Sequence, residues 1–206
     1  MNTLLDIAMH HAESLIVKAK DGDDTAFNKL MELWYKRIYN FAYKYFGDHD
    51  LAMEVAQRTF ITVHKNLRQL RELERFKPWL YRIAHNHCHD EDRKMKKRNV
   101  ISMFNEESEI SAEVGSKISG DIDYSPDKKL QRKELTAQIL DGLQNLSNDQ
   151  REVVIMKEYE GLKFREIAEA LKISENTAKS RLYYGLKFLK KRLLAANVNL
   201  ESYSYE

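Results

Sequence analysis

Apolar residues in the first half of the chain recur at steps of three and four, the spacing of one buried stripe on an α-helix. The clearest stripe spans residues 27–45, lies between breaks at Gly22 and Gly47, and is preceded by a weaker stripe. A further stripe covers residues 52–67, and Pro78 then suits the first turn of another helix. The pattern therefore predicts four helices before about residue 98.

The periodicity is lost between residues 99 and 127. Residues 101–127 hold seven acidic residues and one basic residue, Lys117, together with Ser, Gly and the Ser125-Pro126 pair. Such a composition favours a flexible acidic linker that is at least partly disordered in the free protein. Helical spacing resumes near Lys128, and Ser147 followed by Gln150 forms a capping box.

These boundaries divide the chain into a helical domain at 1–98, a linker at 99–127 and a second helical domain at 128–206. The chain has 206 residues, of which only 7 are Gly and 2 are Pro. So few turn-forming residues disfavour a β-sandwich or barrel. We expect an all-α protein of two small domains.

Charge is segregated along the chain although the formal net charge is only +2. Residues 62–98 contain eleven basic and five acidic residues, and residues 163–192 contain nine basic and three acidic. Two basic blocks on either side of an acidic one are typical of a protein that binds a polyanion. Ordinary solvated helix faces are the alternative interpretation.

Several other classes of protein find no support. The single Cys88 excludes an internal disulfide, and residues 1–21 lack the basic stretch and apolar run of a signal peptide, so we expect a cytoplasmic protein without membrane insertion. No HExxH, P-loop or Gly-rich dinucleotide turn occurs, so we expect no cofactor and no catalytic residues. His85, Cys88 and His89 are potential metal ligands, but no fourth ligand lies close in sequence. We interpret them as a polar helix face beside DNA and expect no metal site.

Residues 164–193 have the layout of a helix-turn-helix. A short helix contains the small residue Ala168, Lys172 and Ile173 form the turn, and Ser174 suits the N-cap of the next helix. In that helix one side is apolar, with Ala178, Leu182, Gly185, Leu189 and Leu193. The other side carries Asn176, Thr177, Ser180, Arg181, Tyr184, Lys187 and Lys191. These residue types read base edges and phosphates when a recognition helix enters the major groove.

The motifs resemble a known family in both halves of the chain. Residues 143–147, 151–154, 166–168 and 173–182 are similar to region four of extracytoplasmic-function (ECF) sigma factors. Residues 56–60 resemble the core-binding helix of region two in this family, and residues 76–86 with Asp90 and Arg93 resemble its promoter-melting helix. The resemblance covers about residues 26–98 and 135–194 in the order of the family.

The resemblance implies a protein that joins core RNA polymerase, recognises a promoter with both domains and helps to separate the strands. The implied polymerase-binding residues are Glu54, Gln57, Thr59 and Phe60. The implied contacts with the minus-ten element are Arg71, Arg75, Lys77, Arg82, Asn86 and Arg93. The implied contacts with the minus-thirty-five element are Asn176, Thr177, Lys179, Ser180, Arg181, Tyr183, Tyr184 and Lys187. An anti-sigma factor is a further candidate partner.

Several positions depart from the pattern of the family. Tyr184 stands where the family often has a basic residue, which bears on base preference, and Leu146-Ser147 replaces a common Leu-Pro. Arg58 stands where the family usually has Glu, which puts that polymerase contact in doubt. Lys172 occupies a turn position that is often Gly, where a positive φ would carry a modest strain.

The main alternative is a helix-turn-helix regulator in which the N-terminal helices sense a signal or form a dimer. The basic helix of region two argues against it, because a sensor domain has no need of such a helix. An interaction-only protein or a phosphodiester-cleaving enzyme is a second alternative, and metal-dependent nicking of DNA would reveal the latter.

Overall fold

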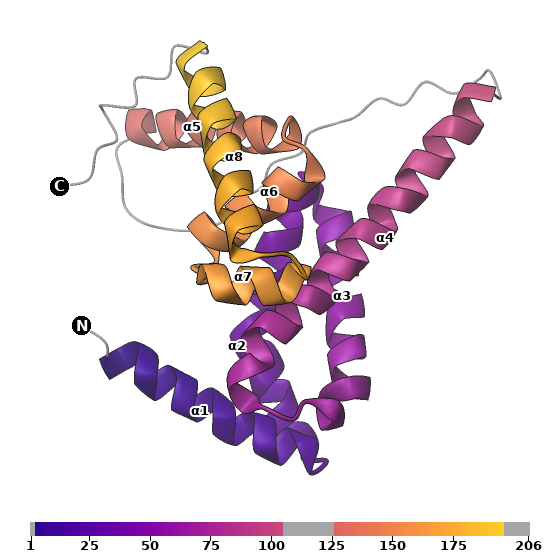
Figure 1. Ribbon diagram of the computed structural model, residues 1–206, viewed down its shortest axis with the longest axis vertical. Coiled ribbons are helices and arrows are strands. Elements are labelled where there is room, and N and C mark those ends of the chain that lie inside the picture. Colours follow the sequence, from indigo (N-terminus) through magenta and orange to yellow (C-terminus); the bar gives the residue numbers. More distant parts are fainter. Residues whose placement is uncertain (1–2, 105–125, 196–206) are drawn as a thin grey trace.

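The computed structural model describes residues 3–104 and 126–195, and their side chains over residues 12–98 and 133–195. Every regular element in these ranges is helical, which confirms the all-α prediction. The helices are α1 (Thr3–Lys20), α2 (Asp24–Phe46), α3 (His49–Asn66), α4 (Phe76–Phe104), α5 (Pro126–Gln144), α6 (Asn148–Val154), α7 (Phe164–Leu171) and α8 (Glu175–Ala195) (Figure 1). Short helical turns η1 (Leu67–Gln69), η2 (Leu73–Arg75) and η3 (Ile155–Tyr159) connect or extend them. Among the described residues, no helix combines the length and hydropathy needed to cross a membrane.

Local signals set the limits of the N-terminal helices. The Asp23 side chain caps α2 by accepting a hydrogen bond of 3.0 Å from the Ala26 amide. Gly47 ends α2 in the left-handed conformation with φ 72°, as the sequence predicts. Asp48 then caps α3 through the Leu51 amide at 2.8 Å.

Helices α1 to α4 pack around an aromatic and aliphatic core, which we call the N-terminal unit. Phe41 and Tyr45 of α2 and Tyr81 of α4 are fully buried. The rings of Phe41 and Tyr81 meet edge to face with centroids 5.7 Å apart, a favoured aromatic geometry. This core fixes the first half of α4 against α2 and α3.

Helix α4 is longer than the sequence predicts. We expected the linker to begin at residue 99, but α4 continues to Phe104, and its end projects away from the rest of the molecule (Figure 1). No Gly or Pro occurs between Pro78 and Gly115, so nothing in the local sequence stops the helix at residue 99. Residues 105–125 of the predicted linker lie outside the described residues.

Helices α5 to α8 form the C-terminal unit, and α7 and α8 make the predicted helix-turn-helix. Lys172 has φ 56° in the turn, the left-handed conformation anticipated for this position. Ser174 caps α8 by accepting from the Thr177 amide at 3.0 Å. Gly185 permits close packing, because a Cβ at this position would lie 2.8 Å from a methyl group of Val154 in α6.

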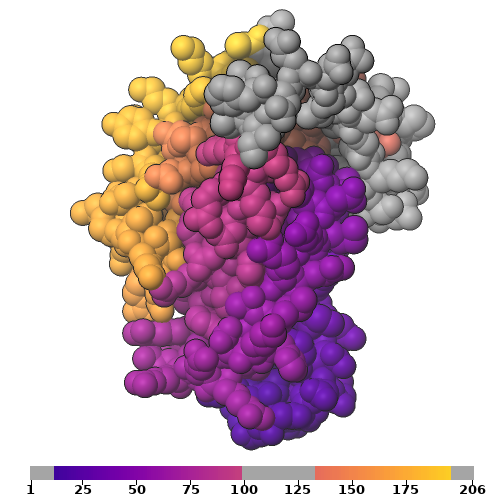
Figure 2. All heavy atoms as spheres, turned by 90° about the vertical axis from the view of Figure 1, so that its right-hand side faces the viewer, coloured from indigo at the N-terminus to yellow at the C-terminus, as the bar shows by residue number. Residues whose placement is uncertain are grey.

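The two units lie against each other. Helix α5 contacts α2, and α7 contacts α4. Figure 2 shows the orange and yellow C-terminal helices directly beside the magenta first half of α4. Buried residues of both units belong to one continuous hydrophobic cluster.

Candidate nucleic-acid interface

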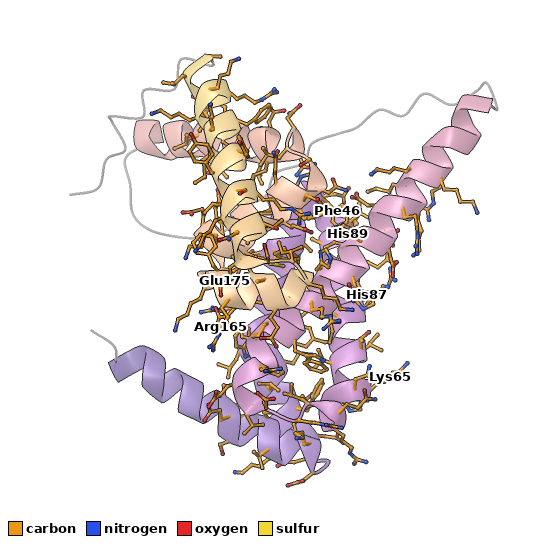
Figure 3. All side chains as sticks on the ribbon, in the orientation of Figure 1. Phe46, Lys65, His87, His89, Arg165 and Glu175 are labelled. Atoms are coloured by element: carbon orange, nitrogen blue, oxygen red, sulfur yellow. The ribbon has the colours of Figure 1, made fainter. Side chains whose placement is uncertain are left out.

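The outward side of α8 is polar and open to solvent. Tyr183 and Tyr184 are 62% and 58% exposed, and their rings meet edge to face at 5.4 Å. The other predicted contacts that are exposed are Asn176, Lys179, Ser180 and Lys187. The apolar side faces inward, with Ala178, Gly185 and Leu189 buried. Figure 3 labels Glu175, which is exposed at the start of this helix.

Two of the predicted α8 contacts are half-buried. The Thr177 hydroxyl lies 2.8 Å from the Ser174 hydroxyl, within the N-cap of the helix. The Arg181 guanidinium forms an ion pair with Asp149 and lies 3.7 Å from Oε1 of Glu152. Asp149 and Glu152 both belong to α6, about thirty positions away, so sequence spacing gave no sign of these partners.

The predicted minus-ten contacts of α4 and its preceding loop divide into two groups. Arg71, Asn86 and Arg93 are exposed, and Arg82 is half-buried. Arg75 and Lys77 instead lie near two acidic residues of α7, Glu169 and Glu166.

Helix α7 places two carboxylates against the start of α4. Arg75 lies 3.7 Å from Glu169, and Lys77 lies 3.7 Å from Glu166. Lys77 also donates a hydrogen bond of 3.4 Å to the carbonyl of Gly161. Burial lowers the pKa of Lys77, although Glu166 opposes the shift. Lys77 is therefore engaged by the C-terminal unit, whereas Arg75 is 58% exposed and has its nearer partner, Glu72 at 2.9 Å, within the N-terminal unit.

Buried polar contacts join the two units behind this face. The Tyr81 hydroxyl donates to Glu160 at 2.6 Å, and burial raises the pKa of that carboxyl. The Arg151 guanidinium donates to the Tyr45 carbonyl of α2 at 2.8 Å and also to the carbonyls of Leu143, Gln144 and Leu146. Arg151 thus ties the end of α5 to α6 and both to the N-terminal unit.

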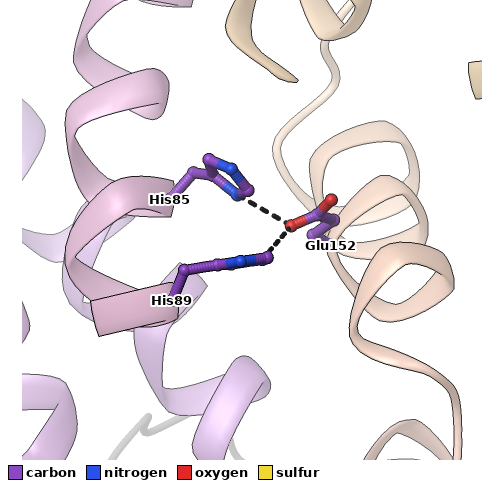
Figure 4. Close-up of side chains that lie close together, drawn as sticks. All are labelled: His85, His89 and Glu152. Atoms are coloured by element: carbon purple, nitrogen blue, oxygen red, sulfur yellow. Dashed lines mark hydrogen bonds and ion pairs between the residues drawn. The ribbon is translucent and has the colours of Figure 1, made fainter. Parts of the chain in front are cut away.

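A cluster of two histidines and one glutamate bridges the units. Nδ1 of His85 lies 2.7 Å, and Nε2 of His89 lies 3.2 Å, from Oε2 of Glu152 in α6 (Figure 4). Burial raises the pKa of Glu152, but its contacts with both histidines outweigh burial and lower it. The hydrogen bond between His89 and Glu152 raises the pKa of His89. Cys88, considered with these histidines in the sequence, is fully buried and does not belong to the cluster.

The predicted polymerase-binding residues of α3 do not share one exposed face. Glu54 and Gln57 are exposed, whereas Thr59 is fully buried and donates to the Val55 carbonyl at 2.7 Å. Phe60 is 4% exposed and stacks with Tyr35 at 6.0 Å. Arg58 turns toward α4, where it donates to Glu91 at 2.9 Å.

Next to Gln57, an open apolar groove of about 390 Å³ lies between α2 and α3. Its lining residues are Phe27, Met31, Tyr35, Gln57, Phe60, Ile61, His64 and Lys65. Ile61, one of the lining residues, is 54% exposed, and Met53 of the same helix is 44% exposed. The motif resemblance did not name Met53 or Ile61 as candidate contact residues. Both lie outside the buried stripe predicted for this helix, so their exposure could have been predicted from the sequence.

Comparison with known sequences finds two family matches in the same order as the two units. Residues 30–98 match the family described as Sigma-70 region 2, and residues 136–189 match Sigma-70, region 4. The ECF RNA polymerase sigma factor SigW of Bacillus subtilis is 30% identical over 182 residues, which cover 86% of this chain and 94% of SigW. The ECF RNA polymerase sigma-E factor of Haemophilus influenzae is 25% identical over 88% of this chain and 94% of its own length.

Solved structures share the fold. CnrH, solved in complex with the cytosolic domain of CnrY, aligns with a TM-score of 0.64 at 20% identity and covers 90% of this chain and 98% of its own. The sigma factor RpoE from Bartonella quintana, solved with the anti-sigma factor NepR, aligns with a TM-score of 0.61 at 24% identity and covers 81% and 96%. The fold of this chain is therefore similar to the folds of CnrH and RpoE in those complexes.

Proposed function

The chain belongs to the family of ECF RNA polymerase sigma factors, and from this premise we propose that it binds core RNA polymerase and directs it to specific promoters. The observation that carries the proposal is the pairing of both sigma-70 regions on one chain, with an exposed polar recognition helix in the second. As a member of a family of initiation factors, the protein acts by binding and not by catalysis, and it acts in the cytoplasm. A sensor or dimerisation domain finds no place in residues 30–98, because region 2 occupies them.

The outward side of α8 recognises the minus-thirty-five element. Ser180 and Tyr184 face bases, and Lys179 and Lys187 contact phosphates. Arg181 also faces bases, once its guanidinium releases Asp149 and binds DNA. The support is the exposure of this side, which allows α8 to enter a major groove without unfolding any part of the unit.

The first half of α4 and the loop before it recognise the minus-ten element and hold its single strand. Arg71, Asn86 and Arg93 are accessible for this role. Lys77 becomes available when α7 moves away from α4, because Glu166 faces it in this arrangement, whereas Arg75 is already exposed and pairs with Glu72 of its own unit. Promoter binding by both units therefore requires the two units to separate.

The groove between α2 and α3 contributes to the polymerase interface. Glu54 and Gln57 offer polar contacts at its edge, and Ile61 offers exposed apolar surface. Thr59 and Phe60 support the groove from beneath. Ile61→Asp should weaken binding to core polymerase at least about fivefold, since one buried apolar side chain contributes about 1.5–3 kcal/mol. Pull-down with core enzyme measures this effect, and Val17→Asp on α1 is the matched control, because it also replaces an exposed apolar side chain with Asp.

The decisive experiment is in vitro transcription with purified core polymerase over a library of linear promoters. We expect transcripts from a subset of promoters that share two short elements, and none from core enzyme alone. The proposal fails if the protein neither joins core enzyme nor changes the set of transcribed promoters. Binding to duplex DNA without any effect on the polymerase would favour the regulator alternative. An anti-sigma partner is a separate proposal, tested by whether a candidate protein blocks the transcripts.

A further inference from the structure

The His85, His89 and Glu152 cluster has the composition of a transition-metal site. The two histidines lie one helical turn apart on α4, and Glu152 faces them from α6 (Figure 4). Their candidate ligand atoms all lie within 4.8 Å of one another. Two imidazole nitrogens and one carboxylate oxygen form a ligand set that binds Zn²⁺ and leaves a fourth position for water.

Two of the three ligand separations already suit a tetrahedral ion, and the two histidine nitrogens, which lie within 4.8 Å of each other, must approach by side-chain rotation. Ligand bonds of about 2.0–2.1 Å place the ligand atoms of a tetrahedral ion about 3.3 Å apart. Oε2 of Glu152 already lies 2.7 Å from His85 and 3.2 Å from His89. In addition, Nδ1 of His85 is buried and its approach to Glu152 lacks hydrogen-bond geometry, so this nitrogen has no satisfied hydrogen bond. We propose that His85 Nδ1, His89 Nε2 and Glu152 Oε2 bind a divalent transition-metal ion of the zinc type.

The cluster is open to solvent only on the side of His89, whose side chain is 41% exposed, whereas Glu152 is 2% exposed. Arg181 lies 3.7 Å from Oε1 of Glu152, so the cation faces the oxygen that the metal does not use. Asp149 pairs with Arg181 and offsets its charge. An open hollow of about 310 Å³ lies beside His89, the one ligand that lines it, and its other lining residues are Asp90, Asp92, Arg93, Lys96 and Asn148. The ion and its water enter from this side.

A metal at this place joins α4 of the N-terminal unit to α6 of the C-terminal unit. A ligand that binds only the packed arrangement stabilises it by mass action. The ion therefore favours the arrangement in which Lys77 faces α7 and not DNA. This consequence rests on the proposed function, whereas metal binding itself does not.

The binding test uses the full-length chain without a polyhistidine tag. Zn²⁺ is titrated against a chromophoric chelator, and Co²⁺ is used separately to report coordination geometry by its visible absorption. We expect one tight site per chain and the absorption of four-coordinate Co²⁺. His89→Ala and Glu152→Gln should each weaken Zn²⁺ binding by at least about tenfold, because even the loss of an outer partner of a ligand costs about 10–100-fold.

Control variants separate this site from other histidines. His64→Ala removes an exposed histidine of α3, and the double variant His10→Ala/His11→Ala removes the adjacent pair near the start of the sequence. Both should bind Zn²⁺ as the wild type does. The proposal is overturned if Glu152→Gln binds Zn²⁺ and Co²⁺ unchanged, because the histidines of α4 would then act alone. It is also overturned if either control variant abolishes binding.

Thermal unfolding and transcription complete the test. Zn²⁺ should raise the melting temperature of the wild type but not of Glu152→Gln. Zn²⁺ should also reduce transcription initiated by the wild type relative to Glu152→Gln at the same Zn²⁺ concentration, which corrects for any effect on core enzyme. Equal inhibition of both overturns the regulatory consequence. Absence of transcription in metal-free buffer overturns the proposed function and leaves the binding result standing.

Discussion

Helices α4 and α8 both carry residues predicted to contact DNA, but the structure places them in opposite situations. The polar side of α8 is exposed along its first three turns, whereas the start of α4 lies against α7. Arg181 is paired within its own unit, while Lys77 is paired across the boundary between the units, and Arg75 pairs with Glu72 at 2.9 Å in its own unit and with Glu169 at 3.7 Å across the boundary.

The difference indicates that the two proposed DNA-binding surfaces are exposed under different structural conditions. Helix α8 depends only on the internal packing of the C-terminal unit, in which Gly185 and Val154 bring α8 close to α6. The α4 surface depends on where the C-terminal unit sits. The free protein should therefore bind the minus-thirty-five element more readily than the minus-ten element, and each prediction below alters one side of this contrast.

The largest effect is expected from Arg151→Ala, which removes a buried connection between the two units. Arg151 is buried and donates to three carbonyls at the end of α5 and to the Tyr45 carbonyl of α2. Its removal leaves buried carbonyls without donors, and each such group costs about 1–3 kcal/mol. We expect a loss of about 3 kcal/mol or more in the free energy of unfolding, measured by urea denaturation.

Arg165→Ala is the matched control for this prediction. Arg165 is an exposed arginine on α7 of the same unit (Figure 3). Its replacement should change the unfolding free energy by less than about 0.5 kcal/mol. If the two variants unfold at the same urea concentration, Arg151 does not join the units as described.

A smaller effect is expected when the polar side of α8 loses its proposed base contacts. The double variant Ser180→Ala/Tyr184→Ala should weaken binding to a cognate minus-thirty-five duplex by about 1–3 kcal/mol, or about 5- to 150-fold. Both residues are exposed, so the unfolding free energy should stay within about 0.5 kcal/mol of the wild type. Fluorescence anisotropy with a labelled duplex measures the binding.

Lys190→Ala provides the comparison on the same helix. Lys190 is exposed and basic but is not among the predicted contacts. A loss of binding as large as that of the double variant would show that general charge, and not the proposed side of α8, governs recognition.

The helix limits and turns behind this contrast could be predicted from the sequence. The contacts between distant residues could not, because they depend on tertiary packing. The limits of α2 and the left-handed turn at Lys172 follow from neighbouring residues, because caps and turns depend on local spacing. The motif resemblance predicts DNA contacts on α4 and α8, and these remain proposals. The pairing of His89 with Glu152 joins residues 63 positions apart, and no local pattern encodes it. The burial of Thr59 likewise depends on how α3 packs in three dimensions.

The smallest effect is expected at the contact between α7 and α4. In Glu166→Gln/Glu169→Gln, the carboxylates that face Arg75 and Lys77 become neutral. Such partly exposed ion pairs contribute about 0–1 kcal/mol each, so the unfolding free energy should fall by no more than about 1 kcal/mol. Because Lys77 becomes easier to release, the free protein should bind single-stranded minus-ten DNA up to about fivefold more tightly, measured by anisotropy. The control Glu134→Gln/Glu158→Gln removes two exposed acidic residues of the same unit and changes the net charge equally. If the control variant gains as much affinity, the effect comes from overall charge, and the covering of α4 by α7 plays no part.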